Sequence, residues 1–221
     1  MLLWKRSDDR NSYLVKKGAT ELTMTSPGRV PMVIPADHLP GPEQGHWTYK
    51  DYTALPDDGH RYEIVDGVLY MAPSPNEWHQ TTAGRLFRYL STYIEDAGLG
   101  RVYIAPFDVE LDPKTVVQPD VLVILNANRD KITFSRIIGA PDLIGEVSSP
   151  GSVGYDREKK QRAYARAGVP EYWIADPWSR TIEVLTLETG AYRTLGVFEG
   201  KAVLPSEVVP DFLVHVEQFF S

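Results

Sequence analysis

The sequence predicts an α/β domain in which a central mixed β-sheet is flanked by helices. Two long helical patterns lie among several short apolar strand patterns, which favours helices that cover the faces of one sheet. One of these helical patterns connects two strands and has about the length that a parallel crossover requires. A hairpin pattern adds two strands near the C-terminus. With 221 residues, 43% of them hydrophobic, the chain can form one sizeable core.

Two parts of the chain differ in composition. Residues 1–45 show little periodicity and many breakers, as in "TSPGRVPMVIPADHLPGPEQG", so we expect a flexible N-terminal tail there. Met24 opens the proline-rich part, and a start of translation at this methionine is an open alternative. We expect residues 46–221 to form the folded domain.

The domain opens with a short helix and a hairpin. In "WTYKDYTALP", Thr48 and Asp51 have the spacing of a capping box, and Pro56 ends the helix. Two alternating runs in "RYEIVDGVLYMAP" then surround Asp66 and Gly67, a dipeptide that favours a tight hairpin turn.

The longest helical pattern runs from residue 77 to residue 97. Apolar residues recur there at helical spacing, and Gly98 closes the helix. We expect this helix to be the main one of the core. Its apolar positions are Trp78, Leu86, Leu90, Tyr93, Ile94 and Ala97.

Strand patterns follow this helix. "VYIA", "FDVELD" and "VVQPDVLVIL" predict three strands, and the third is almost entirely apolar after Asp120, as in a strand buried on both faces. "DLIGEVSSP" at 142–150 predicts a short buried strand that nevertheless contains Glu146. A helix over 155–167, capped by Gly168, leads to the strand "EYWIAD", which we expect to lie parallel to the previous one. "TIEVLTL" and "AYRTLGVF" form the C-terminal hairpin.

Composition and missing motifs exclude several classes of function. The net charge of −7 argues against a protein that coats nucleic acid without specificity. The chain has no cysteine and its five histidines are scattered, so any metal would have oxygen ligands. No apolar run has the length of a membrane span and nothing marks export, so we expect a cytoplasmic protein. No serine nucleophile elbow, phosphate-binding loop or dinucleotide-binding turn occurs.

Glu146 requires a partner or a role, because a charge in a buried strand is costly. Asp142 shares its strand face but lies roughly 13 Å away, at about 3.3 Å per residue, which is too far to share one metal ion. Asp120 begins another strand, and the two carboxylates can converge if the strands are neighbours. Carboxylates that close repel each other, and a divalent ion such as Mg²⁺ removes the repulsion.

The helical segment "DREKKQRAYARAG" concentrates basic residues against the overall negative charge. Lys159 or Lys160, in its first turns, can bring an ammonium group back over the two acids. The nearby helix N-terminus also favours a bound phosphate. Two acids, a lysine and a hard metal ion beside a site for an anion predict phosphodiester cleavage.

Each of these residues also has an ordinary interpretation. Asp120 has the position of a strand-end or turn residue. Glu146 is equally suited to a structural ion pair with Lys159, Lys160 or an arginine. Lys160 taken alone is typical of a solvated helix charge. The metal-site hypothesis rests on their occurring together.

These segments resemble a known family. "QPD" at 118–120, "PDLIGEVSSP" at 141–150 and "DREKKQRAYARAGVPEYWIAD" at 156–176 are similar to the bacterial "putative restriction endonuclease" family of the PD-(D/E)xK nuclease superfamily. The upstream "RYEIVDGVLYMAPSP", followed by His79, fits as well, and the resemblance spans residues 47–187.

The resemblance implies a restriction-endonuclease-like core, Mg²⁺-dependent hydrolysis of DNA, with Mn²⁺ as a substitute, and a possible homodimer. Asp120 and Glu146 match metal ligands, and the backbone carbonyl of Val147 is a further candidate ligand. Lys160 matches the family lysine. Glu63 and His79 match positions that border the site, although the first also suits a solvent-facing acid and the second a structural hydrogen bond.

One feature departs from the superfamily pattern. Its lysine follows two residues after the second acid, where this chain has Ser148, so the lysine has moved to the helix. We therefore expect a Mg²⁺-dependent endonuclease acting on DNA. The alternative is a catalytically silent nucleic-acid-binding or protein-interaction module on the same fold, and activity on RNA or on branched or damaged DNA is a third possibility.

Overall fold

The structure, a computed structural model, describes residues 5–6, 12–17, 20–25, 32–149 and 152–221. Contacts divide the chain into two units, Met1–Met32 and Val33–Ser221. In the first unit, strands β1 (Lys5–Arg6), β2 (Ser12–Lys17) and β3 (Thr20–Thr25) form an antiparallel sheet. Part of the tail that was expected to be flexible lies outside the described residues, and its flexibility stays a prediction.

The second unit begins earlier than the boundary expected at residue 46. Strand β4 (Ile34–Pro35) pairs with a strand of the domain, and the backbone N–H of Ala36 donates to Leu69 at 2.9 Å. The N–H of Gly45 likewise donates to the carbonyl of Gly67 at 2.7 Å. Residues 33–45 therefore pack against the domain through backbone hydrogen bonds, which leave no periodic pattern in the side chains.

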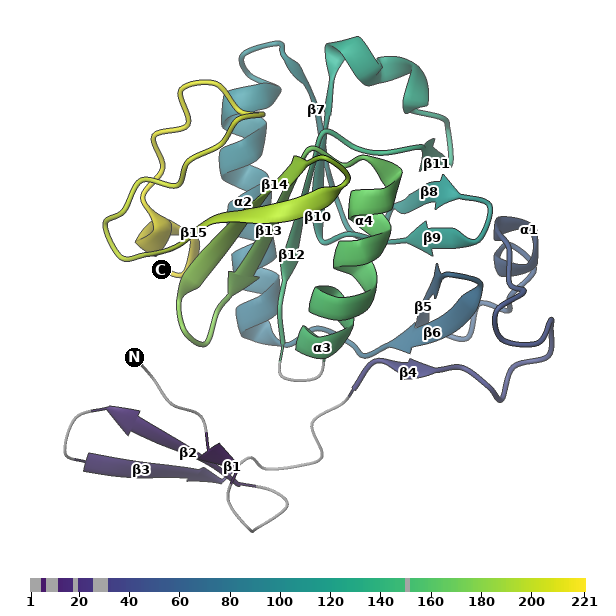
Figure 1. Ribbon diagram of the computed structural model, residues 1–221, viewed down its shortest axis with the longest axis horizontal. Helices are drawn as coiled ribbons and strands as arrows, with labels where there is room; N and C mark the ends of the chain where they lie inside the picture. The colour runs from purple at the N-terminus through teal and green to yellow at the C-terminus, as the bar shows by residue number, and fades with distance from the viewer. Residues whose placement is uncertain (1–4, 7–11, 18–19, 26–31, 150–151) are drawn as a thin grey trace. The chain divides into compact units, whose positions relative to one another are not determined.

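The main sheet has six strands and is mixed, in agreement with the expected fold class (Figure 1). Its strand order is β15-β14-β13-β12-β10-β7, and only β12 and β13 run parallel to each other. The C-terminal hairpin, β14 and β15, extends this sheet as predicted. The strands are β7 (Gly100–Ile104), β10 (Val121–Leu125), β12 (Leu143–Val147), β13 (Glu171–Asp176), β14 (Thr181–Glu188) and β15 (Ala191–Glu199).

A second six-stranded sheet lies beside the first, in the order β11-β8-β9-β5-β6-β4. It contains the predicted hairpin, whose turn residues Asp66 and Gly67 both have positive φ, at 55° and 72°. The run "VVQPDVLVIL" is not one strand, because Pro119 and its neighbours separate β9 from β10 and send them to different sheets. The remaining strands are β5 (Arg61–Val65), β6 (Val68–Ala72), β8 (Asp108–Asp112), β9 (Thr115–Val117) and β11 (Arg136–Ile138).

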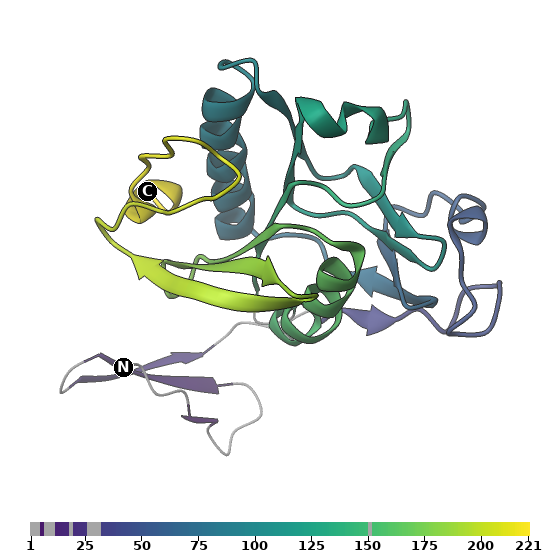
Figure 2. The same cartoon turned by 45° about the horizontal axis from the view of Figure 1, so that its top comes forward.

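Helices cover both faces of the main sheet (Figure 2). Helix α2 (Glu77–Ile94) lies on one face and α4 (Gln161–Ala167) on the other. Among the described residues no helix is both long and apolar enough for a membrane span. The smaller helices are α1 (Tyr49–Tyr52), α3 (Val153–Tyr155), a π-helical turn at Asp156–Lys160, and 3-10 helices at Asn126–Lys131 and Val216–Phe219.

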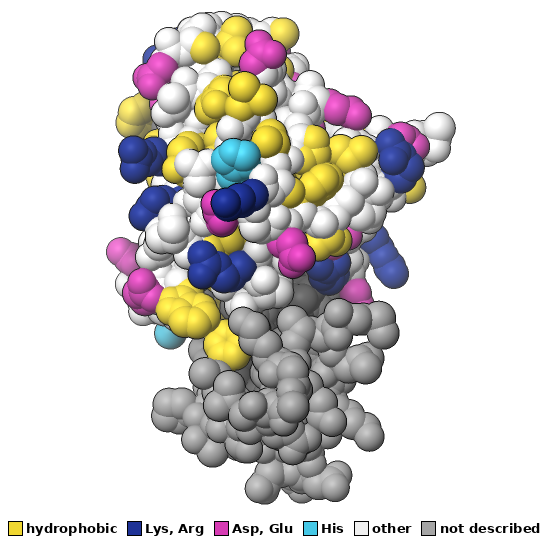
Figure 3. Space-filling view, turned by 90° about the vertical axis from the view of Figure 1, so that its left-hand side faces the viewer, with side chains coloured by type: hydrophobic (Ala, Val, Ile, Leu, Met, Phe, Trp, Pro, Cys, Tyr) yellow, Lys and Arg dark blue, Asp and Glu magenta, His cyan; other side chains and the backbone are white. Residues whose placement is uncertain are grey.

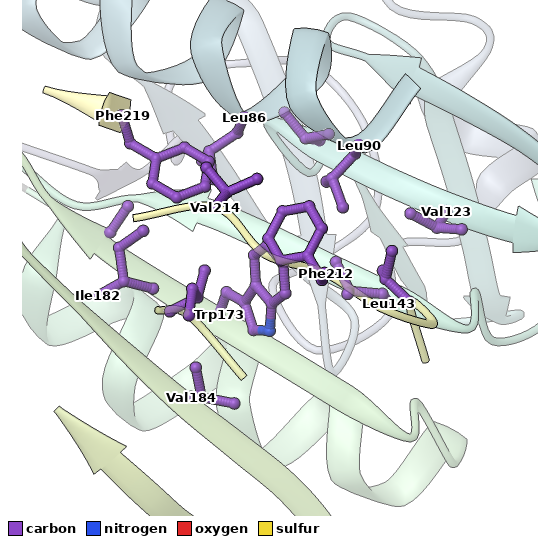
Figure 4. Close-up of a cluster of buried hydrophobic side chains, with 14 of the residues drawn as sticks. Leu86, Leu90, Val123, Leu143, Trp173, Ile182, Val184, Phe212, Val214 and Phe219 are labelled. Carbon is purple, nitrogen blue, oxygen red and sulfur yellow. The ribbon is translucent and has the colours of Figure 1, made fainter. Parts of the chain in front are cut away.

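The core against α2 joins the sheet to the C-terminal segment (Figure 4). Leu86 and Leu90 of α2 pack there with Trp173 of β13, and Phe212 lies against the Trp173 ring at 5.5 Å between centroids. Trp78, expected on the same core face, is instead 52% exposed. It lies in the first turn of α2, where the helix begins beyond the edge of this core.

Candidate active site

Strand register brings Asp120 and Glu146 together. β10 and β12 are antiparallel neighbours in which Val121 lies opposite Gly145. Asp120 precedes the first of these residues and Glu146 follows the second, so the two acids face each other across the strand pair. The backbone N–H of Val147 donates to Oδ2 of Asp120 at 2.8 Å, which ties the two strand ends. The strand adjacency on which the expected convergence depends is present.

The ammonium group of Lys160 lies between two glutamates. Its Nζ is 2.9 Å from Oε1 of Glu146 and 2.9 Å from Oε1 of Glu63. All three residues are buried, at 3–4% exposure, so the interpretation of Lys160 as a solvated helix charge is wrong. Lys160 ends the π-helical turn that precedes α4, and such turns occur frequently at functional sites. Lys159, the other candidate, is exposed.

Glu63 comes from the second sheet and is held by its neighbours. It lies in β5, and its Oε1 accepts the backbone N–H of Gln118 at 2.7 Å. Arg61 of the same strand donates to the carbonyl and side chain of Gln118, at 3.1 Å each. Gln118 lies two residues before Asp120 and thus connects Glu63 to the segment that contains Asp120. Glu63 is buried, so its interpretation as a solvent-facing acid is wrong.

His79 contacts Asp120 from the first turn of α2. Its Nε2 lies 3.1 Å from Oδ2 of Asp120, and Asn76 caps the helix by accepting the backbone N–H of His79. Burial, the largest influence, would raise the pKa of Asp120, but the hydrogen bond and charge of His79, the N–H of Val147 and the charge of Lys160 together lower this pKa below its usual value. Asp120 is therefore held as a carboxylate.

Tyr164 is a residue of the site that sequence reasoning missed. Its hydroxyl donates to Oε1 of Glu146 at 2.6 Å, on the same oxygen that Lys160 contacts. Burial, followed by the charge of Glu146, raises the pKa of Tyr164 well above its usual value. The spacing Lys160 to Tyr164 is one helical turn, and this spacing on a helix predicts a shared face. That signal was available in the sequence.

Asp142 and Ser148, two further positions considered in the sequence analysis, make other contacts. Asp142 occupies the opposite end of β12, where its carboxylate accepts the backbone N–H of Leu125 at 2.7 Å and the side chain of Asn128 at 2.7 Å. Ser148, in the place of the superfamily lysine, donates its backbone N–H to Ala175 at 2.8 Å. Neither contributes a charge to the cluster.

The charges of the cluster do not cancel. Three buried acidic side chains, those of Asp120, Glu146 and Glu63, lie with one lysine, so their formal charges sum to minus two. His79 Nδ1 is buried without a hydrogen-bond partner. Excess negative charge and oxygen donors fit a hard divalent cation.

The side chains limit how an ion could be held. Within the described ranges no group of three or more His, Asp or Glu side chains is placed so that it could hold a metal ion. An ion at Asp120 and Glu146 would therefore have two side-chain ligands at most, a number that Mg²⁺ accepts when water and phosphate oxygens complete its shell.

Comparisons with known proteins identify the family and a similar fold. A family model, Uma2, described as "Putative restriction endonuclease", matches residues 49–217. A crystal structure of a "putative nuclease belonging to DUF820" from Anabaena variabilis ATCC 29413 superposes with a TM-score of 0.66 at 18% identity and covers 79% of this chain and 97% of that chain. The structural likeness supports the fold alone. No curated protein matches the sequence.

Proposed function

The chain belongs to the Uma2 family of restriction-endonuclease-like proteins, and from this membership and the buried acidic cluster we propose that it is a Mg²⁺-dependent endonuclease that hydrolyses DNA phosphodiester bonds. The single observation that carries the proposal is the meeting of Asp120, Glu146 and Lys160, from three separate segments, in one buried cluster with excess negative charge. Mn²⁺, also a hard cation, would substitute for Mg²⁺.

In the proposed mechanism the carboxylates of Asp120 and Glu146 would hold the ion, and the backbone carbonyl of Val147 would be a third candidate ligand. A divalent ion bound there supplies a Lewis acid and lowers the pKa of water. Lys160 stabilises negative charge on the oxygens of the reacting phosphate, and Glu63 holds the Lys160 side chain in place. His79 orients the Asp120 carboxylate through the contact at 3.1 Å.

The test is incubation of the purified protein with supercoiled plasmid and with single-stranded DNA, in Mg²⁺, in Mn²⁺ and in EDTA. We expect cleavage only with a divalent ion, and loss of cleavage in Glu146→Gln, which keeps the shape of the side chain and removes its charge. Glu158→Gln is the control for the same chemical change, because Glu158 is an exposed acid in the π-helical turn that contains Lys160. Full activity of Glu146→Gln would refute the site.

One observation favours the alternative of a silent binding module. Lys160 lies within 2.9 Å of both Glu63 and Glu146, and a buried ion-pair cluster of this kind also satisfies charges without any ion. That alternative predicts retention of labelled DNA with no cleavage under any metal condition. Adding RNA as a second substrate distinguishes a ribonuclease from the deoxyribonuclease proposed here.

A further inference from the structure

Two exposed tryptophans from distant segments pair on the surface. Trp78, in the first turn of α2, is 52% exposed, and Trp178, in the turn between β13 and β14, is 43% exposed. Their ring centroids lie 5.5 Å apart with 32° between the planes. The buried tryptophans Trp47 and Trp173 are at 2% and 0%. The pair therefore exposes large aromatic surfaces that the core does not use.

The pair lies at the same end of the main sheet as the acidic cluster. Trp78 directly precedes His79, whose imidazole contacts Asp120. Trp178 follows Ala175 by three residues, and Ala175 pairs with Val147, the residue after Glu146. The turn is ordered, because Asp176 accepts the backbone N–H of Trp178 at 2.8 Å. Both indoles are thus anchored to backbone segments that also position the site.

We propose that Trp78 and Trp178 stack against an unpaired nucleobase of DNA next to the phosphate that is cut. The proposal rests on the proposed function and names its substrate class: DNA with unpaired bases, as in single strands, gaps or flaps. Indole faces stack on any base, whereas in a duplex the base faces are covered by their neighbours. Arg180, exposed in the same turn as Trp178, supplies a cation for the adjoining phosphates.

The charge of the protein makes a contribution other than charge necessary for DNA binding. The net charge is −7, and on the face shown in Figure 3 the basic side chains are interspersed with acidic ones. Neutralisation of phosphates therefore contributes less to DNA binding than in a basic protein. Aromatic stacking does not depend on net charge, so the tryptophan pair supplies a contribution that charge does not.

The test measures binding of fluorescently labelled oligonucleotides in EDTA, where the DNA stays uncut. We expect Trp178→Ala to weaken binding of single-stranded DNA about tenfold or more, within the range of stacking contributions, and to change duplex binding little. Trp178→Phe should recover most of the affinity. Phe134→Ala is the matched control, because Phe134 is a fully exposed aromatic residue at a different turn, and it should bind like the unmodified protein. Thermal melting of each variant verifies its fold.

A substrate series makes the assignment specific. Each oligonucleotide of the series has one abasic position, at a different site. The unmodified protein should bind one of them about tenfold more weakly than it binds the intact oligonucleotide. Trp178→Ala should bind that oligonucleotide and the intact one with the same affinity, because loss of the base and loss of the indole remove the same interaction. Equal binding by Trp178→Ala and Phe134→Ala would overturn the proposal and leave the pair as a contact for protein.

Parallel cleavage assays keep this proposal separate from the proposed function. Cleavage that depends on Mg²⁺ and is unaffected in Trp178→Ala, for any DNA, overturns the stacking proposal alone. Stacking on single-stranded DNA without cleavage under any metal condition supports the aromatic contact and overturns the nuclease.

Discussion

Lys160 Nζ lies 2.9 Å from Oε1 of Glu146, although 14 residues and a change of element separate them in the chain. Glu146 lies in β12 and Lys160 lies in the π-helical turn. Their contact therefore depends on how the helical segment that begins at α3 packs against β12. Loss of either partner changes both the charge of the cluster and the stability of the fold.

Lys160→Ala should abolish Mg²⁺-dependent cleavage and also destabilise the protein. Removal of one partner from a buried ion pair costs about 3–5 kcal/mol, because Glu63 and Glu146 are left without their cation. Urea denaturation measures this cost. Addition of Glu63→Gln to Lys160→Ala should restore part of the stability and none of the activity. A double variant no more stable than Lys160→Ala would show that Glu63 and Lys160 do not interact.

His79→Ala should weaken the response to magnesium without changing the ligands themselves. Loss of a residue that orients a metal ligand commonly costs about 10–100-fold in metal affinity or activity. The measurement is the Mg²⁺ concentration that gives half-maximal cleavage, and it should rise in His79→Ala. His38→Ala is the control, because His38 is exposed and distant in sequence from the site. The same magnesium dependence in both variants would contradict the orienting role.

Tyr164→Phe removes one hydrogen bond from Glu146 and leaves the aromatic packing. A hydrogen bond to a charged group contributes about 1.5–3 kcal/mol, so the free energy of unfolding should fall by that amount and cleavage should slow as Glu146 loses its orientation. Tyr192→Phe, which removes a hydroxyl bonded to the carbonyl of Val169 at 2.9 Å, should reduce stability with no effect on cleavage. Equal cleavage rates of the two variants would contradict the role of Tyr164.

Glu171 should make stability depend on pH. Burial raises the pKa of Glu171 above its usual 4.5, against the lowering effect of hydrogen bonds from Ser206 and Glu207. The unfolded chain then releases this proton at lower pH than the folded protein, so the contribution of Glu171 to stability is complete below 4.5 and is lost as pH rises through the raised value.

Denaturation of Glu171→Gln beside the unmodified protein, at pH values on both sides of 4.5, checks this sign. As pH rises, the free energy of unfolding of the unmodified protein should fall relative to that of Glu171→Gln. Glu217→Gln, at an exposed acid, provides the baseline. A difference that stays constant or changes in the opposite direction would contradict the pKa shift.

Much of the fold was predictable because its signals are local. The Asp66-Gly67 turn, the capping box at Thr48 and the helix end at Gly168 each depend on a few neighbouring residues, and each is present. The assembly of the second sheet was not predictable in this way, because the pairs β4 with β6, β5 with β9 and β8 with β11 join strands that are distant in sequence. The exposure of Trp78 was missed because helical spacing gives the face of a helix but not how far the core extends along it.

The candidate site was predictable where strand geometry constrained it. Alternation and adjacency were sufficient to pair Asp120 with Glu146. The resemblance favoured Lys160 over Lys159, and the structure buries Lys160 and leaves Lys159 exposed. The contact of Glu63 with Lys160 joins the second sheet to the helical segment before α4, and no local pattern indicates it. The roles of these residues in catalysis stay predictions.

The measurement that tests the central claim most directly is isothermal titration calorimetry of Mn²⁺ binding. It compares the purified unmodified protein with the variants Asp120→Asn and Glu146→Gln. We predict one site per chain in the unmodified protein, displaced by excess Mg²⁺ and lost in both variants, because each removes one of the two facing carboxylates. Absence of binding, or binding that is the same in all three proteins, would contradict a metal site between Asp120 and Glu146.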